Sequence, residues 1–249
     1  MDIPSDIVPS LAGVVVLTAI TTAVLALARV PRPASPAIAI LRGAVQLAVL
    51  SVILTGVITS PIWIALALVV MFAAASAVAT GRTGRSPAAF LTMATSIAAG
   101  VATTLVVVFA TGALAFTPRY VLAIGAIIIG NAMSMATLTG RLFTTAVVDH
   151  WDEVEGWLAL GATPRQSTRG LARRCIRDAL IPGIDQTRTT GLVVLPGAFV
   201  GAIFGGISPV DAGRFQIVVL AGIMAAGSIT STLVVRWMGA VRRRPAPLP

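Results

Sequence analysis

The sequence predicts an all-α, polytopic integral membrane protein with about seven transmembrane helices in a single domain over residues 1–249. Hydrophobic residues make up 57% of the chain and charged residues 11%, whereas about a quarter of the residues in a soluble domain are charged. The mean hydropathy is +0.95. Because one crossing requires about 20 apolar residues, a chain of this length provides for six or seven crossings.

Seven apolar segments follow one another along the chain. We expect membrane spans at about 7–28, 37–57, 61–79, 88–110, 120–138, 189–207 and 215–237. Asp2 and Asp6 stand where a signal peptide requires positive charge, so we expect the first span to remain uncleaved. A charged segment over about 140–188 separates the fifth span from the sixth, and residues 242–249 are expected to form a disordered tail.

All 18 basic residues are arginines, and most lie at the ends of the apolar segments. Positive residues collect on the cytoplasmic side of membrane proteins. This rule places the amino terminus outside and the carboxy terminus in the cytoplasm, with only Arg119 and Arg214 left outside. The arginines are not interleaved with base-stacking aromatic residues, which argues against nucleic acid as a partner. The sequence contains no lysine and therefore no P-loop, so any ATP must be hydrolysed by another subunit.

The charged segment predicts two helices joined by a tight turn. Trp151, Val154 and Leu158 recur at three- and four-residue spacing and give the first helix an apolar face. Gly161 is placed to end that helix in a left-handed conformation. Thr163 can cap the second helix together with Gln166, three residues later. We expect the second helix to begin at Pro164, to carry arginines at four-residue spacing, and to end near Leu180, before a bend at Pro182-Gly183.

Two interpretations of this segment are equally consistent with its composition. It is either a solvated helical hairpin or a rigid surface that fits a groove in a partner. Two tryptophans favour the contact surface, because aromatic residues are enriched at interfaces. The candidate partner-contacting residues are Trp151, Glu153, Glu155, Trp157, Leu158, Gly161, Ala162, Thr163 and Pro164.

The stretch Glu155–Pro164 resembles the EAA loop of ABC transporter permeases, in which a glutamate precedes a glycine by six positions. Gly156-Trp157 replace the two alanines of that loop. More of the chain is similar to the FetB-type family of bacterial ABC permeases assigned to iron export. The similar stretches are LRGAVQL (41–47), IIGNAMSMATLTGRL (128–142), EVEGWLALGATPRQS (153–167), ALIPGID (179–185) and LPGAFVGAIFGGISPVDAGRFQIVVL (195–220).

The resemblance implies a homodimer of permeases bound to two copies of a separate ATPase, which would hold the ATP and magnesium. It also implies a location in the inner (plasma) membrane of a bacterium and a role in metal or stress homeostasis. Because the chain has no P-loop, we expect that it is not itself an enzyme. Plant relatives of the family are linked to aluminium tolerance and to a nucleotide sugar, so another small solute is an alternative cargo. A non-ABC scaffold or ion-coupled carrier is a further alternative. An intramembrane enzyme is disfavoured, because the spans show no Ser/Lys, Asp/Asp or HExxH arrangement.

Polar residues within the spans are candidates for a translocation pathway, because an unsatisfied polar group is costly in hydrocarbon. Gln46, Asn131 and Gln216 are of this kind, with interhelical hydrogen bonding as the alternative role. Met133 and Met135 offer thioether ligands or ordinary core packing. Pro196 interrupts the sixth span, where glycines at four-residue spacing fit helix packing or a gate. Because His150 and Cys175 are the only residues of their types and lie outside the spans, no tight metal site is assigned.

Overall fold

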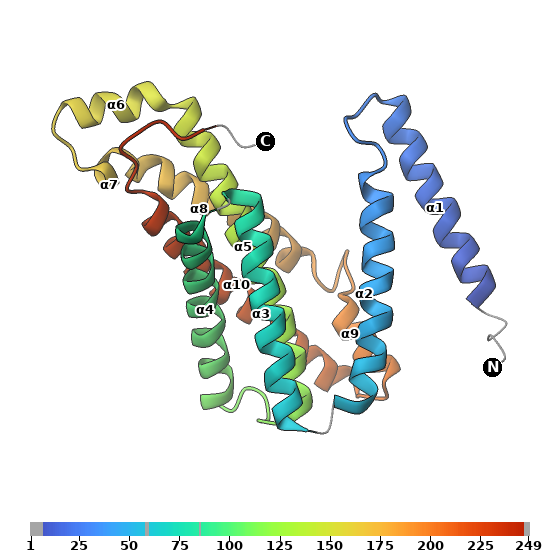
Figure 1. Ribbon diagram of the computed structural model, residues 1–249. Helices are drawn as coiled ribbons and strands as arrows, with labels where there is room; N and C mark the ends of the chain where they lie inside the picture. The colour runs from blue at the N-terminus through green and yellow to red at the C-terminus, as the bar shows by residue number, and fades with distance from the viewer. Residues whose placement is uncertain (1–6, 58–59, 85, 247–249) are drawn as a thin grey trace. The chain divides into compact units, whose positions relative to one another are not determined.

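The computed structural model describes residues 7–57, 60–84 and 86–246, and these residues are almost entirely helical (Figure 1). Among them an isolated β-bridge between Thr190 and Val194 is the one strand-like pairing. The helices are α1 (Ile7–Leu27), α2 (Ser35–Val57), α3 (Pro61–Thr83), α4 (Pro87–Ala110), α5 (Pro118–Asp149), α6 (Trp151–Ala159), α7 (Pro164–Ser167), α8 (Arg169–Thr189), α9 (Gly197–Phe204) and α10 (Pro209–Met238). The all-α prediction is therefore confirmed for the described part of the chain.

The chain divides into two compact units, Met1–Thr59 and Ser60–Pro249. The first unit is a hairpin of α1 and α2. Its turn places Arg29 (φ 54°) and Arg32 (φ 59°) in the left-handed region, which is uncommon for residues other than glycine. The aspartates on which the expectation of an uncleaved first span depends, Asp2 and Asp6, lie outside the described residues, as do the last three residues of the expected tail.

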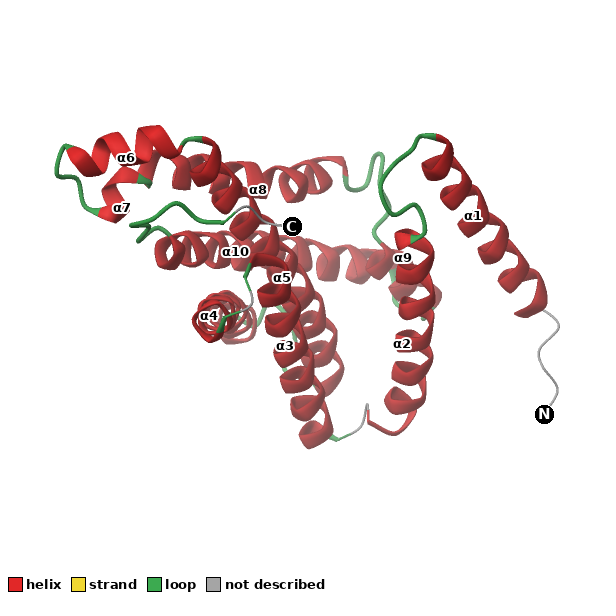
Figure 2. Cartoon of the chain, turned by 45° about the horizontal axis from the view of Figure 1, so that its top comes forward, coloured by secondary structure: helices red, strands yellow, loops and turns green. Residues whose placement is uncertain are grey.

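In the second unit α10 packs against α4 and α5, and α3 packs against the same two helices. Figure 2 shows α8 running beside α10, with α6 and α7 at one end of this unit. The main core consists of apolar side chains from α3, α4, α5 and α10, such as Ile97, Ile128 and Val234, none of which is exposed. These four helices of the second unit therefore share the main apolar core.

Small residues allow α4 and α10 to approach closely. A Cβ atom added at Gly100 would lie 2.6 Å from the backbone oxygen of Ala226 and 2.4 Å from the hydroxyl of Thr230. The same hydroxyl donates to the backbone oxygen of Ser96 at 3.3 Å. Within membranes helices associate through such close contacts, because lipid tails are as apolar as the helices themselves. The α4–α10 contact therefore depends on glycine at position 100.

Five described helices are long and apolar enough to cross a membrane: α1 from Pro9, α3, α4, α5 and α10. In α2 the apolar stretch whose side chains the structure describes, Ser35–Ser51, is shorter. The expected sixth span, 189–207, is not one helix, since residues 190–196 are not helical and α9 has only 8 residues. The interruption that Pro196-Gly197 predicts is present, because Pro196 is the N-cap of α9. The structure thus supports five continuous candidate spans, and seven remains a prediction.

The sequence predicts that the helix beginning at Pro164 ends near Leu180, and this prediction is wrong. α8 continues through Pro182 to Thr189. A proline inside a helix removes one backbone hydrogen bond and normally favours a break. Here tertiary packing holds the helix together, because Ala179 is fully buried and a Cβ at Gly183 would lie 3.4 Å from the sulfur of Met224 on α10.

Replacing Gly100 tests the α4–α10 contact. We expect Gly100→Ala to lower the free energy of unfolding by about 1–3 kcal/mol, because the added methyl group meets backbone atoms of α10. Gly81→Ala is the matched control, since a Cβ there meets nothing within 4 Å and alanine favours the helix by about 0.5–1 kcal/mol. Thermal unfolding in detergent measures both. Equal melting temperatures for the two variants would contradict the close contact.

Candidate functional site

The candidate site is the corner formed by α6, the turn after it and α7, over residues 151–167. α6 is amphipathic: Val154 is fully buried, Trp151 and Leu158 are half-buried, and Glu153 and Glu155 are exposed. The predicted apolar face of this helix is therefore confirmed. The apolar face packs α6 against the rest of the unit, and the acidic face of α6 is exposed.

The turn between α6 and α7 has the predicted left-handed glycine. Gly161 has a φ of 87°, and the N–H of Ala162 donates to the carbonyl of Trp157 at 3.0 Å. This six-to-one hydrogen bond is typical of a Schellman ending. The backbone N–H of Thr163 donates to Oε1 of Gln166 at 2.8 Å, as in a capping box. Local hydrogen bonds thus fix the sharp reversal of the chain.

A second hydrophobic cluster supports the corner from beneath. It joins Val154 of α6 to Phe143 and Val147 of α5, and it includes Leu171 and Cys175 of α8 and Val235 of α10. A hydrogen bond also joins the start of α8 to the end of α10: the hydroxyl of Thr168 donates to the carbonyl of Gly239 at 2.9 Å. A displacement of α6 would therefore be transmitted to three long helices at once.

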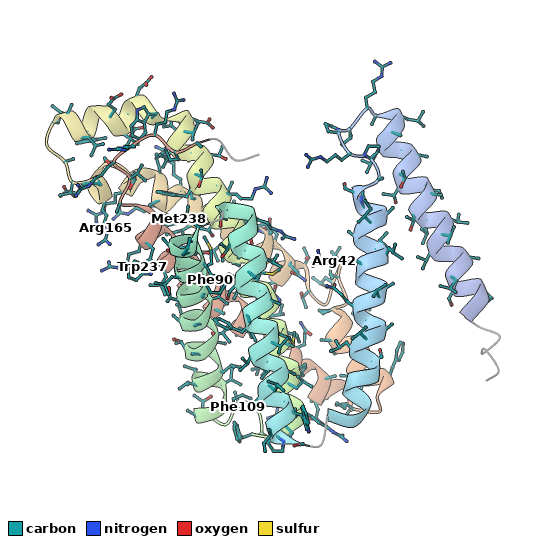
Figure 3. All side chains as sticks on the ribbon, in the orientation of Figure 1. Arg42, Phe90, Phe109, Arg165, Trp237 and Met238 are labelled. Atoms are coloured by element: carbon teal, nitrogen blue, oxygen red, sulfur yellow. The ribbon has the colours of Figure 1, made fainter. Side chains whose placement is uncertain are left out.

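The outer surface of the corner combines acidic and aromatic groups. Trp157 is 51% exposed and Leu160 is 82% exposed. The acidic residues Asp149, Asp152, Glu153 and Glu155 form no ion pair within 4.0 Å in the described part of the chain. Figure 3 shows Arg165, Trp237 and Met238 near this corner, whereas Phe109 lies at the opposite end of the same unit. The corner thus presents an exposed indole beside unpaired carboxylates, which suits a partner with basic and apolar groups.

The other predicted coupling residues lie on the same corner. Ala162 and Pro164 are half-buried, whereas Gly161 and Thr163 are exposed. The structure therefore brings the whole predicted coupling set together within a short stretch of chain. Their contact with a partner remains a prediction.

The predicted pathway residues are scattered. Asn131 is half-buried and donates from Nδ2 to the carbonyl of Ile127 at 2.9 Å. Met133 packs against the main core, and the side chain of Met135 lies beside Gly227. Gln216 is 6% exposed, and its Oε1 has no hydrogen-bond partner in the described residues. The four residues share one bundle without forming a common cluster.

The two remaining pathway residues lie apart from these four along the chain. Pro196 precedes α9, and Gln46 lies on the exposed surface of α2 in the first unit.

A cavity of about 390 Å³ lies between the first turns of α5, the helix α9 and the first turns of α10. Tyr120 and Ile127 line it from α5, Gly201 from α9, and Phe215 from α10. Asn131 is one helical turn beyond Ile127 on α5, so this polar side chain continues the cavity-facing row. Arg119 and Asp211 bring opposite charges to the cavity.

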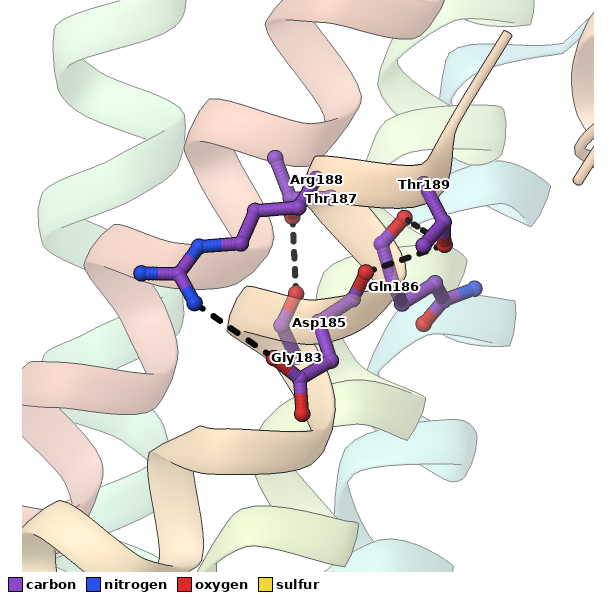
Figure 4. A network of polar contacts seen from close by, with 6 residues as sticks. All are labelled: Gly183, Asp185, Gln186, Thr187, Arg188 and Thr189. Carbon is purple, nitrogen blue, oxygen red and sulfur yellow. Dashed lines mark hydrogen bonds and ion pairs between the residues drawn. The ribbon is translucent and has the colours of Figure 1, made fainter. Parts of the chain in front are cut away.

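The second half of α8 carries polar residues that the sequence reasoning did not select. Asp185, Gln186 and Arg188 are exposed, and Nη1 of Arg188 lies 3.7 Å from Oδ1 of Asp185 (Figure 4). In the sequence, Pro182 and Gly183 predict the end of a cytoplasmic helix. Asp185, Gln186 and Arg188 then fall in the expected connection between that helix and the next span, where no functional residue is predicted. An acid and an arginine three positions apart, next to an apolar segment, were the available signal.

These features define a multi-pass, all-helical membrane protein with a compact helical corner at one end. The chain belongs to UPF0014, described as an uncharacterised protein family, whose pattern matches residues 8–241. It is 39% identical to the UPF0014 membrane protein STAR2 of rice over 197 residues, covering 78% of this chain and 69% of STAR2. No solved structure matches it.

Two further relatives match smaller parts of the chain. The Arabidopsis protein ALUMINUM SENSITIVE 3 is 38% identical over 173 residues, covering 68% of this chain and 63% of the relative. The probable iron export permease protein FetB of Escherichia coli is 37% identical over 145 residues, covering 58% and 56% respectively. The predicted relationship to the FetB-type family is confirmed.

The thiol of Cys175 provides a test of the cluster beneath the corner. Burial, together with the negative charge of Asp178, raises the pKa of Cys175. Because the thiolate is the reactive form, we expect iodoacetamide at pH 8 to label the folded protein at least about ten-fold more slowly than the protein in SDS. The labelling rate should rise steeply at more alkaline pH. Rapid labelling of the folded protein at pH 8 would show that the cluster is open.

Proposed function

We propose that this chain is the membrane-spanning subunit of an ABC transporter that exports metal ions. A separate ATPase subunit would bind ATP and magnesium and hydrolyse the nucleotide. The observation that carries the proposal is the corner at residues 151–167, a rigid amphipathic helix with an exposed indole and unpaired carboxylates. The similarity to a relative named as an iron export permease supports the same function.

The corner suits the transmission of force. An ATPase groove that closes on ATP would push on the exposed face of α6, and the cluster around Val154 would carry that displacement into α5, α8 and α10. An apolar helix face seated in a groove is a common mode of recognition. Two copies of this chain would bind two ATPase copies, since paired nucleotide sites require paired docking surfaces.

The proposed topology follows from the distribution of arginine. The amino terminus lies outside, and the corner and the carboxy terminus lie in the cytoplasm of a bacterial cell. Seven crossings result if α2 spans the membrane and if the second half of α8, residues 190–196 and α9 together form one interrupted crossing. Iron is the proposed cargo, and a panel of Fe²⁺, Mn²⁺, Al³⁺ and a nucleotide sugar in reconstituted vesicles distinguishes it from other solutes.

Capture of an ATPase subunit tests the docking surface. We expect Trp157→Ala to reduce co-purification of the ATPase encoded beside this chain at least about ten-fold, because hot-spot aromatics contribute about 2 kcal/mol or more to an interface. Trp63→Ala is the matched control, since Trp63 on α3 is 54% exposed, close to the 51% of Trp157. Equal capture by both variants would overturn the docking assignment.

Transport coupling tests the turn itself. Gly161→Ala places a side chain at φ 87°, which costs about 1–2 kcal/mol in the left-handed region. We expect the number of solute molecules moved per ATP hydrolysed to fall at least about ten-fold, because the corner no longer transmits the closing movement. Gly156→Ala, within α6 and with nothing within 4 Å of its added Cβ, is the control. Unchanged stoichiometry in Gly161→Ala would contradict this role.

A further inference from the structure

The second half of α8 reaches the middle of the bundle. On α10 the segment between Arg214 and Arg236 contains no charged residue, and Met224 stands ten positions after the first arginine and twelve before the second. A helix rises about 1.5 Å per residue, so Met224 is about 15 Å from one charged end and about 18 Å from the other. A Cβ at Gly183 would lie 3.4 Å from the sulfur of Met224. Gly183 therefore lies at the centre of the apolar layer.

Charged side chains follow within two turns of this level. Asp185 and Arg188 form an ion pair at 3.7 Å, and their side chains are 61% and 76% exposed. Gln186, between them, is also exposed. Figure 4 shows these side chains on α8 beside the neighbouring helices, with the hydroxyls of Thr187 and Thr189 bound to backbone carbonyls of α8. A carboxylate and a guanidinium thus project from one face of α8 near the middle of the membrane, and an amide projects from another face.

Hydrocarbon cannot surround such a face. Ionisable residues at this depth face a bundle interior or a water-filled cavity, and they mark ion pathways. α8 also ends here at Thr189, and residues 190–196 are not helical before α9 begins. Irregular backbone at membrane depth is tolerated where it lines a cavity. Interrupted helices place their carboxy-terminal, partially negative ends toward cations.

We infer that the Asp185 face of α8 lines an aqueous translocation pathway and that Asp185 contacts a cationic cargo. Arg188 acts as a tethered counter-ion: it neutralises Asp185 when no cargo is present, and a divalent cation displaces it. Competition of this kind keeps binding weak, as release on the far side requires. Oxygen donors such as the Asp185 carboxylate suit hard cations. This inference rests on the proposed transport function and adds the cargo-contacting group.

Water access to this face can be tested without cargo or ATPase. In a Cys175→Ser background, which removes the single cysteine of the sequence, Asp185→Cys is exposed to a charged, membrane-impermeant methanethiosulfonate in membrane vesicles. Ala102→Cys is the depth-matched control. Ala102 is exposed on α4, midway between Gly100, which lies beside Ala226, and Thr104, which lies beside Gly222. It is therefore level with Met224.

We expect Asp185→Cys to react at least ten-fold faster than Ala102→Cys, because charged reagents reach a thiolate only through water. Arg188→Cys provides a second position on the same face of α8. Equally slow labelling of the positions on α8 and of the control would overturn the aqueous pathway. Monodisperse elution of each variant in detergent shows that it is folded.

The cargo role is tested with the reconstituted complex and Fe²⁺ or Mn²⁺. We expect Asp185→Asn to reduce cation transport at least ten-fold while the ATPase subunit still co-purifies, and Asp185→Glu to restore most of it. Arg188→Gln should lower the cation concentration that gives half-maximal transport, because the competing guanidinium is gone. The inference would be overturned if Asp185→Asn transported cations at the wild-type rate, or if the wild-type complex transported only anionic solutes. Either result would leave the transporter assignment standing. Failure of the wild-type chain to bind any ATPase would instead overturn the proposed function.

Discussion

Hydrocarbon offers no hydrogen bonds, and this one constraint explains most of the second unit. The long helices satisfy their own backbone groups, and their hydroxyls bond back to the preceding turn, as Ser76 does to Phe72 and Thr137 to Met133. Association between helices then depends on close contact rather than on water exclusion. The closest of these contacts, at Gly100, brings α4 against the backbone of α10. Because α5 and α8 also pack on α10, the bundle depends on the position of that helix.

α8 and α9 depart from this pattern. α8 is a long helix with an internal proline and exposed charges near its end, and α9 is too short to cross a membrane. Between them the chain has no regular structure at a depth where other segments are fully helical. A protein tolerates this departure only if water or polar groups cover the segment. The same physical rule that stabilises α3, α4, α5 and α10 is therefore the basis for proposing a pathway along α8.

Local signals in the sequence were sufficient for the corner and insufficient for α8. The left-handed turn at Gly161 and the hydrogen bond between Thr163 and Gln166 involve only neighbouring residues, so their spacing predicted them. The course of α8 beyond Pro182 depends on α10, where Met224, 41 residues further along the chain, lies against Gly183. The sequence alone does not show that contact, so Pro182 predicts the end of the helix and Asp185 falls between two expected helices.

The continuity of α8 changes how the corner and the membrane interior are related. The sequence suggested a cytoplasmic helix ending near Leu180 and a separate span beginning near residue 189. The structure instead extends the first of these through Pro182 to Thr189, in one helix of 21 residues, about 30 Å long. Its first turns share a hydrophobic cluster with α6, and its last turns carry the Asp185–Arg188 pair. A displacement at the corner therefore reaches the ion pair through a single helix. Pro182 lies between the two ends, where one missing backbone hydrogen bond makes bending easiest.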